Sequence, residues 1–445
     1  MASRSSIIKR GPFRFLRTGT TFARVFAGYK AITLAQRFRG EAWVEERRLR
    51  HHHRSAERLY RTAISLEGVL IKAGQFLGAR ADILPEAYVE VLSRLHDAVP
   101  ADPFSIVKPA IERELGRPLE VAFAEFEPRP IAAASLAQVH RARLHDGREV
   151  AVKVQYPGIE RIVQSDLTNL AFFIGMLNRF DRSFDYAFLV DELRENVPKE
   201  LDFVNEGHNA ERMARAFADD DSLIVPAIHW ELTTRRVLTM EFEEGIKITD
   251  VERLRAAGID GREVAQLLTA SYAQQIVQHS FFHADPHPGN LLVRPGPQIV
   301  FLDFGLAKEL SPEFSRLFAV LAKAIFDSDD DTMGEAFRSL GLRTKGDDHE
   351  GYVALGNAYG GDLIRGAATT GYIDIEMVEG SYQDAVKLVR KNPVVAFPPE
   401  MLMIGRVFGL LSGISKHLDA QTNMREVFRP FFEDLEPLEE AQPAG

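Results

Sequence analysis

The chain reads HADPHPGN at residues 283–290 and DFG at residues 303–305, and its fold follows from these two motifs and the segment that joins them. Between these two motifs, residues 291–293 and 299–302 are apolar and predict two short strands. The Pro-Gly-Pro sequence at residues 295–297 supplies the turn between them. A β-hairpin therefore joins the two motifs and returns the chain to the point where it began.

This hairpin brings polar side chains together. We expect Asn290 and Asp303, which flank it, to lie side by side. An amide and a carboxylate in that arrangement can share a magnesium ion held against phosphate oxygens. Asp285, on the preceding loop, is left to orient or deprotonate an acceptor hydroxyl or a water molecule. Phosphoryl transfer needs little more from a protein than positioning and charge neutralisation, so these residues predict that chemistry.

A second hairpin, further upstream, carries a lysine. Residues 139–144 and 150–154 predict strands, and Asp146-Gly147 is a pair typical of a tight hairpin turn. Lys153 lies on the second strand, where its ammonium can reach nucleotide phosphates and where a carboxylate must hold it. We expect Glu206 to be that carboxylate.

An alanine-rich run precedes the first strand of this upstream hairpin. It reads Ala132, Ala133, Ala134, Ser135, Leu136, Ala137 and Gln138. The motifs at 283–290 and 303–305 resemble the catalytic and metal-binding loops of the protein-kinase-like superfamily, and ordinary kinases carry a glycine-rich phosphate lid at the place of this run. Because alanine does not take the positive φ angles that glycine permits, we expect a stiffer lid that holds phosphates differently.

Helical periodicity dominates the rest of the chain. Residues 56–97 predict a helical preface in which Pro85 starts a second helix. Residues 158–217 are also helical in character, with expected breaks near residues 182–184 and at Pro198. After the DFG motif, residues 306–321 predict a helix. Residues 356–371 are glycine-rich and predict a mobile loop.

Composition limits the function classes. The chain has 445 residues, 45% of them hydrophobic, and a net charge of −10, values typical of a folded, water-soluble protein. It has no cysteine, which excludes disulfides, thiolate metal sites and a cysteine nucleophile. No apolar run approaches the ~20 residues of a membrane-spanning helix. We expect a cytoplasmic protein whose membrane contact, if any, is peripheral at the inner membrane face.

The first 40 residues differ from the rest. They hold nine Lys or Arg and no Asp or Glu, so the remainder of the chain carries −19. The acidic body argues against nucleic acid as a partner. The basic leader is interleaved with apolar residues and is open to three interpretations: an amphipathic segment on an anionic membrane surface, a basic tail that is solvated, disordered or docked on the body, or a transit peptide. The nearby run His51 to His53 favours solvated side chains over a metal tract.

Together these motifs resemble the UbiB/AarF-type atypical kinase family, whose members support coenzyme Q biosynthesis. Four features carry the resemblance, which extends over about residues 66–418. They are Lys72-Ala73-Gly74-Gln75 as the family's KxGQ motif, the alanine-rich run at 132–138, the ExD motif Glu200-Leu201-Asp202 with Glu206 beyond it, and the pair of motifs at 283–290 and 303.

The resemblance implies a role for each matching residue. Lys153 contacts phosphates and pairs with Glu206, Asn290 and Asp303 bind Mg²⁺, and Asp285 is the catalytic aspartate. Residues 240–242 form the hinge beneath the adenine, which adds Glu241 and Phe242 to the nucleotide contacts. Lys72 and Gln75 fold over the active site against Glu200 and Asp202 and block access by a protein substrate.

Two departures from the family pattern bear on the substrate. Many bacterial members end in transmembrane helices, whereas this sequence ends in a phenylalanine-rich helical segment and an acidic tail, so we do not expect attachment through the C-terminal end. No Ala-Pro-Glu motif follows residues 303–305, and a peptide-docking segment is therefore not expected. A small molecule, a lipid or water is the expected acceptor.

The expected fold is α+β: a bilobal protein-kinase-like fold with a small antiparallel sheet in the N-lobe, a helical C-lobe and a helical N-terminal extension. The predicted boundaries are a basic leader at 1–50, a helical extension at 51–115, an N-lobe with a helical insertion at 116–243, a C-lobe at 244–433 and a disordered tail at 434–445.

The expected function is that of an atypical kinase-like protein that binds ATP or ADP with Mg²⁺. We expect ATPase activity, or small-molecule or lipid kinase activity, that supports quinone or prenyl-lipid metabolism. The main alternative is a nucleotide-switched pseudokinase scaffold for a biosynthetic complex. A protein kinase is disfavoured by the KxGQ motif. The loop at 283–290 also resembles antibiotic phosphotransferases, against which the alanine-rich run and the helical preface speak.

Overall fold

The structure is a computed structural model that describes residues 11–78, 85–96, 101–180, 187–346, 351–353, 394–420, 423–432 and 435. The chain divides into two compact units. Unit 1 contains Met1–Gly207 and Ile228–Phe242, and unit 2 contains His208–Ala227 and Glu243–Gly445. The expected mobile loop at 356–371 lies outside the described residues, and so does the expected disordered tail at 434–445 apart from residue 435.

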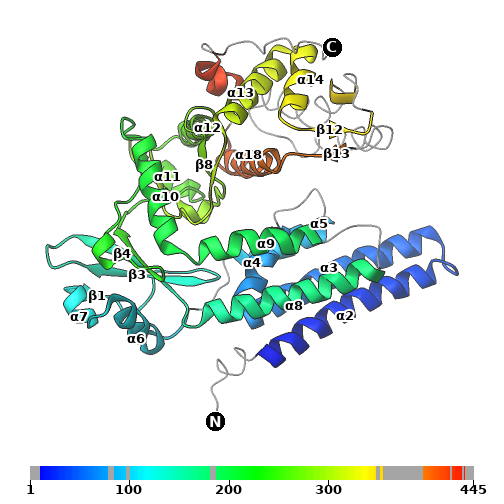
Figure 1. The fold of residues 1–445 in the computed structure, drawn as a ribbon, viewed down its shortest axis with the longest axis horizontal. Helices are drawn as coiled ribbons and strands as arrows, with labels where there is room; N and C mark the ends of the chain where they lie inside the picture. Colours follow the sequence, from blue (N-terminus) through cyan, green and yellow to red (C-terminus); the bar gives the residue numbers. More distant parts are fainter. Residues whose placement is uncertain are drawn as a thin grey trace, which may run out of the picture. The chain divides into compact units, whose positions relative to one another are not determined.

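Unit 1 contains a five-stranded antiparallel sheet (Figure 1). Its strands are β1 (Glu125–Phe126), β2 (Ala132–Ala133), β3 (Ala137–Arg143), β4 (Glu149–Gln155) and β6 (Val237–Glu241). β3 and β4 pair from Ala137 opposite Gln155 to Arg143 opposite Glu149, which confirms the predicted hairpin. Gly147 in its turn has a positive φ of 92°, the conformation that glycine permits.

Helices surround this sheet and extend from it. They are α2 (Gly11–Ala35), α3 (Glu41–Leu66), α4 (Val69–Gly78), α5 (Glu86–Ser93), α6 (Phe104–Leu115), α7 (Leu119–Ala122), α8 (Ile159–Phe180) and α9 (Ala187–Glu200). α6 and α7 pack on the sheet, since Val107 and Ile111 share a core with Val150 and Val152. The other helices have their own apolar core. α10 (Phe203–Ala216) runs across the division between the units.

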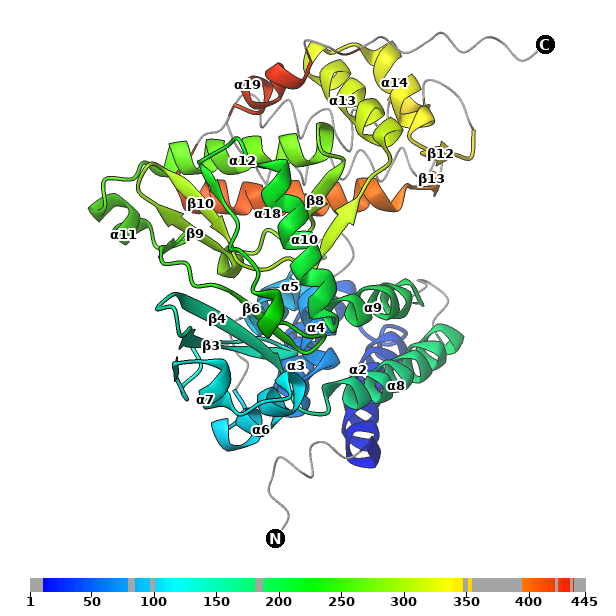
Figure 2. The same cartoon turned by 60° about the vertical axis from the view of Figure 1, so that its left-hand side comes forward.

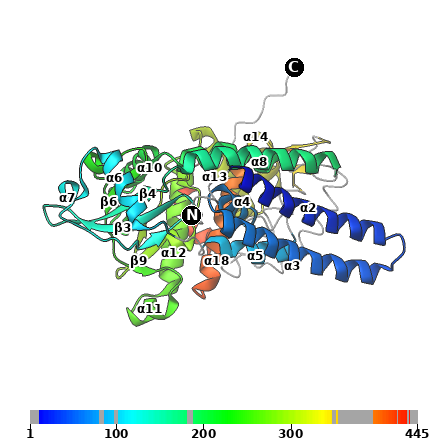
Figure 3. The same cartoon turned by 90° about the horizontal axis from the view of Figure 1, so that it is seen from below.

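Residues 11–35 of the basic leader form a helix that docks on the body of unit 1. α2 lies beside α3 and α8 (Figure 3). Arg14 is fully buried there, and its guanidinium binds the carboxylate of Asp166 on α8. It also donates to the carbonyl oxygens of Leu66 and Glu67, which end α3. Of the interpretations left open by the sequence, the docked segment is the one observed for residues 11–35.

Three details of unit 1 differ from expectation. α9 runs through Pro198 to Glu200, because proline's fixed φ suits a helix and only one hydrogen bond is lost. The predicted boundary at residue 50 falls inside α3. Two of the three histidines in the run are partly buried, since His51 contacts the carbonyl oxygen of Val25 and burial lowers the pKa of His52, whereas His53 is exposed as expected.

Unit 2 has one four-stranded sheet in the order β5-β10-β9-β7 and two strand pairs, β8 with β11 and β12 with β13. The strands are β5 (Leu223–Ile224), β7 (Ile246–Lys247), β8 (Phe281–His283), β9 (Leu291–Arg294), β10 (Gln298–Phe301), β11 (Ala307–Glu309), β12 (Arg343–Thr344) and β13 (Val394–Ala396). The helices are α11 (Val251–Ala256), α12 (Gly261–Val277), α13 (Pro312–Asp327), α14 (Asp330–Ser339), α18 (Pro399–His417) and α19 (Met424–Phe428).

Two antiparallel pairings fix the backbone around the motifs. β9 and β10 form the predicted hairpin after residue 290. β11 pairs with β8, so the expectation of an unbroken helix at 306–321 is wrong. Ser311 caps α13 and Pro312 starts it. A capping serine followed by proline marks the start of a helix, so the helix does not extend back to residue 306. α12 and α18 lie side by side in the same unit (Figure 2).

Within the described residues, no helix has the length and the apolar character needed to cross a membrane.

Candidate active site

Unit 1 holds a buried ion pair. Lys153 on β4 and Glu206 on α10 place Nζ and Oε1 2.7 Å apart, with side-chain exposures of 11% and 2%. The ring of Phe203, in the first turn of the same helix, lies 5.2 Å from the ammonium. A buried carboxylate needs such a cation, because an unpaired charge at this depth is costly. The pairing of Lys153 with Glu206 that the sequence predicts is therefore present in the structure.

The alanine-rich run forms a tight turn between β2 and β3. Ala132 pairs with Val139, Ala133 pairs with Gln138, and the amide of Ala134 donates to the carbonyl oxygen of Ala137 at 2.7 Å. The structure describes all residues from 132 to 137, and none of them has a positive φ. The turn needs no glycine, and this explains why alanine is accepted where glycine is usual. The side chain of Ser135, which lies within this turn, is buried.

The expected hinge lies at the end of β6. Glu241 pairs with Val150, and the amide of Phe242 donates to the carbonyl oxygen of Glu149 at 3.0 Å. The guanidinium of Arg141 lies 4.4 Å from the centre of the Phe242 ring. Since the Phe242 amide is used within the sheet, it does not donate to an adenine in this conformation.

The KxGQ and ExD motifs meet in unit 1. Lys72 on α4 and Glu200 at the end of α9 form an ion pair of 2.7 Å between Nζ and Oε1. Gly74 packs tightly, because a Cβ there would lie 2.2 Å from the Leu95 side chain. Asp202 instead lies 3.6 Å from Arg235 and accepts the amide of Asn205. The Gln75 side chain lies outside the described residues.

The loop after β8 is held by buried hydrogen bonds. Nε2 of His283 donates to the carbonyl oxygen of Asp303, and Nδ1 accepts from the hydroxyl of Tyr272 at 3.1 Å. The amide of His283 donates to Gln275 on α12. Burial lowers the pKa of His283 against the opposing effect of Asp285 and Asp303. A neutral histidine thus ties the loop at residues 283–290 to the DFG motif.

The β9–β10 hairpin returns Asp303 to the neighbourhood of Asn290. Leu291 pairs with Phe301, and the amide of Leu302 donates to the carbonyl oxygen of Asn290 at 3.0 Å. Asp303 accepts the amide of Gly305 on Oδ1. The donor set is a carboxylate and an amide oxygen, which suits Mg²⁺ that also takes phosphate and water ligands. In the described chain, no group of three or more His, Cys, Asp or Glu forms a metal site.

Asp285 has a partner that the sequence analysis missed. Nη2 of Arg406 on α18 lies 3.3 Å from Oδ1 of Asp285. Arg406 is the only charged residue between Glu400 and Lys416. An isolated charge in an apolar helix needs a partner, and that signal was available in the sequence. Asn209, which donates to the carbonyl oxygen of Phe304 at 3.0 Å, was missed as well and had no such signal.

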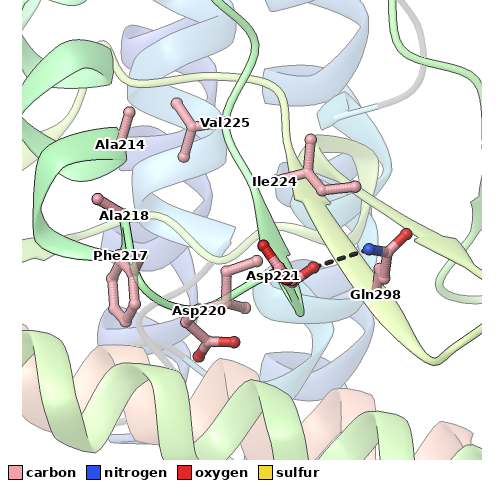
Figure 4. Close-up of a pocket in the computed structure, with 9 residues that line it drawn as sticks. Ala214, Phe217, Ala218, Asp220, Asp221, Ile224, Val225 and Gln298 are labelled. Carbon is pink, nitrogen blue, oxygen red and sulfur yellow. Dashed lines mark hydrogen bonds between the residues drawn. The ribbon is translucent and has the colours of Figure 1, made fainter.

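A pocket of about 460 Å³ lies elsewhere in unit 2, where α10 ends and β5 begins (Figure 4). Phe217, Ile224 and Val225 give it apolar walls, and Gln298 bonds to the carbonyl oxygen of Asp221 at its edge. None of the predicted site residues lines this pocket.

The fold and the two sets of residues define a protein-kinase-like protein: an antiparallel sheet with a buried lysine–glutamate pair, and a hairpin between catalytic-loop and DFG sequences. The chain belongs to the family described as the ABC1 atypical kinase-like domain, whose model matches residues 94–337.

Named relatives agree with this assignment. The chain is 41% identical over 283 residues to AarF domain-containing protein kinase 1 of Xenopus tropicalis, covering 62% of this chain and 54% of the relative. It is 38% identical over 336 residues to the protein of that name from Mus musculus, covering 74% and 64%. It is also 32% identical over 448 residues to the uncharacterized protein sll1770 of Synechocystis, covering 96% and 74%. The chain thus spans less than two thirds of the length of the two animal relatives.

A solved structure supports the fold alone. The complex of Rv3197 with erythromycin from Mycobacterium tuberculosis is similar with a TM-score of 0.60 and 24% sequence identity, covering 88% of this chain and 98% of that one. The kinase-like fold expected from the sequence is confirmed.

Proposed function

We propose that this chain binds Mg-ATP and transfers or hydrolyses its terminal phosphoryl group. The observation that carries the proposal is the register of β9 and β10, in which Asn290 and Asp303 occupy the same end of one hairpin. The buried pair of Lys153 and Glu206 supports it, since a lysine fixed by a carboxylate is preorganised to meet phosphate oxygens.

Each predicted residue has a role in this proposal. Asn290 and Asp303 hold Mg²⁺, which neutralises charge on the phosphates when it is bound. Lys153 contacts the phosphates, and the turn at 132–137 covers them. Glu241 and Phe242 contact the adenine through groups other than the Phe242 amide. Glu206 is a positioning residue for Lys153.

Asp285 orients the acceptor. The acceptor oxygen forms a bond to the γ-phosphorus while the bond from that phosphorus to the bridging oxygen breaks. The electron pair of the broken bond leaves with ADP, and the acceptor proton passes to the Asp285 carboxylate. With water as acceptor the products are ADP and phosphate, and with an alcohol they are ADP and a phosphate ester.

We propose a small molecule, a lipid or water as the acceptor, in quinone or prenyl-lipid metabolism. The ion pair of Lys72 with Glu200 supports a regulatory role for the KxGQ and ExD motifs, because it ties α4 to α9 in unit 1. Gln75 and Asp202 belong to the same proposed regulatory group. The quinone connection rests on the family resemblance, since a fold does not fix a substrate.

We propose an anionic membrane surface as a second partner, which α2 contacts. Large apolar side chains are exposed on α2 and on its neighbour α8: Phe13, Phe15, Leu16, Phe172 and Met176. The exposed fractions of Leu16 and Phe172 are 65% and 51%. Arg17, Arg24 and Lys30 are exposed on α2, which has no acidic residue. Exposed apolar groups among cations are the chemistry that binds anionic lipid headgroups.

Vesicle sedimentation tests the membrane contact. Replacing Leu16 and Phe172 by Glu is expected to lower binding to anionic vesicles at least roughly tenfold, because two apolar side chains are lost and two negative charges are added. Val395→Glu, at an exposed apolar position in unit 2, is the matched control and is expected to bind normally. Equal binding by all three proteins would place the membrane contact elsewhere.

Mg-dependent ATP turnover tests the main proposal. It is measured with and without anionic vesicles and a phenolic quinone precursor, beside Asp303→Asn. The proposal predicts turnover that requires Mg²⁺, rises with lipid or phenol and is lost in the variant. ATP binding without turnover, together with full cellular function of Asp285→Asn, would favour the nucleotide-switched scaffold instead.

A further inference from the structure

α18 carries one arginine into the catalytic loop. Nη2 of Arg406 lies 3.3 Å from Oδ1 of Asp285, although the two residues are 121 positions apart in the sequence. Their side chains are 23% and 18% exposed, so the pair is largely shielded from water. A charge-assisted hydrogen bond of this kind is stronger than one between neutral groups.

The helix that carries Arg406 is fixed by its apolar face. Ile404, Val407 and Leu411 are buried on α18, which packs on α12. Within the described residues, Nε of Arg406 is buried and has no hydrogen-bond partner. A buried guanidinium Nε without a hydrogen bond is costly, and its presence here points to a role for Arg406 other than stability.

α12 holds the backbone of the same loop. Gln275 accepts the amide of His283, and Tyr272 binds the His283 ring. The two helices therefore have separate tasks: α12 fixes the start of the loop, and α18 contacts the carboxylate that the loop carries.

We propose that Arg406 is the positioning residue for Asp285, an inference that rests on the proposed phosphoryl transfer. By binding one carboxylate oxygen, it fixes the rotamer in which Asp285 meets the acceptor hydroxyl or water. Orientation is a large part of catalysis in phosphoryl transfer, and a small misplacement of the aspartate lowers the rate. Arg406 acts through Asp285 and contributes little to nucleotide binding.

Three variants separate this role from a structural one. Arg406→Gln removes the charge, Arg406→Lys keeps it on a side chain with one point of contact, and Lys416→Gln changes an exposed residue of the same helix as the control. ATP affinity and kcat are measured for each with Mg²⁺. We expect Arg406→Gln to lower kcat roughly 10- to 100-fold with ATP affinity within about twofold. Arg406→Lys should recover part of kcat, and Lys416→Gln should match the wild type.

The Asp285→Asn background gives a sharper test. If Arg406 acts through Asp285, adding Arg406→Gln to Asp285→Asn lowers kcat no further. An equal loss in both backgrounds, or a kcat within about twofold of the wild type for Arg406→Gln alone, would overturn the inference.

Hydrogen exchange keeps this inference separable from the proposed function. Amides of the loop are held by internal bonds, such as Ala284 to Leu306 and Asn290 to His287. Arg406→Gln is expected to speed amide exchange in the peptide covering residues 283–290, while Lys416→Gln leaves it unchanged. Absence of turnover in the wild type would contradict the proposed function. Unchanged exchange in Arg406→Gln would contradict the positioning of Asp285, and of the loop residues around it, by Arg406.

Discussion

Nζ of Lys153 and Oε1 of Glu206 lie 2.7 Å apart, and almost no solvent reaches either side chain. The two residues come from different kinds of element, since Lys153 lies on the central strand β4 and Glu206 in the first turn of α10. Each charge compensates the other, because an unpaired charge at this depth would be costly. The pair therefore links the stability of unit 1 to the position of the proposed phosphate-binding ammonium.

Removing either partner is expected to lower both stability and nucleotide binding. Lys153→Met leaves Glu206 buried without this cation, and we expect a loss of roughly 3 kcal/mol in the free energy of unfolding. Lys153→Met combined with Glu206→Leu should recover most of that stability but no ATP binding, because the apolar pair packs without binding phosphate. Urea unfolding and nucleotide titration measure the two effects.

Lys199→Met serves as the control for this pair, since Lys199 pairs with Glu195 on an exposed helix surface. Its cost should stay below about 1 kcal/mol. Unchanged ATP affinity in Lys153→Met would remove Lys153 from the nucleotide site.

The ion pair between Lys72 and Glu200 predicts that two single variants behave alike. Lys72→Ala and Glu200→Gln both break the link between α4 and α9, so each should change nucleotide preference or turnover in the same direction. The double variant should add little to either one. Steady-state kinetics with ATP and ADP check this, with Lys108→Ala, which breaks an exposed ion pair with Glu120, as the control. Wild-type kinetics in both single variants would leave the KxGQ motif without a regulatory role.

Because Arg14 is buried against Asp166, we expect the basic leader to contribute to the stability of the fold. Arg14→Leu removes a buried guanidinium that binds Asp166 and the end of α3, so we expect a loss of about 3–5 kcal/mol in the free energy of unfolding. Arg17→Leu, at an exposed position one turn away, should change it by less than about 0.5 kcal/mol. Chemical denaturation of the two variants gives the comparison. Equal stabilities would mean that α2 does not dock through Arg14.

Because His140 is buried, we expect unit 1 to lose stability as the pH falls. Burial lowers the pKa of this ring from 6.5. In the neutral form its Nδ1 donates to the backbone carbonyl oxygen of Glu127, and its Nε2 accepts from the side-chain amide of Gln138. Because the unfolded chain binds a proton near pH 6.5 that the folded ring resists, stability is present above that pH and is lost as the pH falls. The contribution of one such ring is at most about 1.4 kcal/mol per pH unit.

Thermal or urea unfolding between pH 7.5 and 5 measures this slope. His140→Leu should show a shallower loss of stability on acidification than the wild type. Identical slopes in the His140→Leu variant and the wild type would contradict a neutral, buried His140.

Local signals in the sequence predicted the hairpins and the pair they position. The Asp146-Gly147 turn and the Pro-Gly-Pro turn at 295–297 each specify a reversal over a few residues, and short-range chemistry decides such reversals. The pairing of Lys153 with Glu206 could be predicted because a buried charge needs a partner. Pro85 before α5 was an equally local signal, and the helix begins after it.

What the sequence did not reveal depends on packing between distant segments. β11 pairs with β8 only because the chain folds back past His283, so the apolar residues after Gly305 predicted a helix instead. Arg406 meets Asp285 from a helix 121 residues further along the chain. Arg14 docks α2 through a partner on α8, and no periodicity within α2 indicates that partner.

The central claim is that Asp303 binds a magnesium ion together with ATP. Calorimetric titration of ATP, with and without Mg²⁺, tests this directly on the wild type and on Asp303→Asn. Asp260→Asn is the control, since Asn caps α12 as well as Asp does. The account predicts that Mg²⁺ tightens ATP binding at least roughly tenfold in the wild type and in the control, and that Asp303→Asn loses this gain. Equal affinities with and without Mg²⁺ in the wild type, or a full gain in Asp303→Asn, would contradict it.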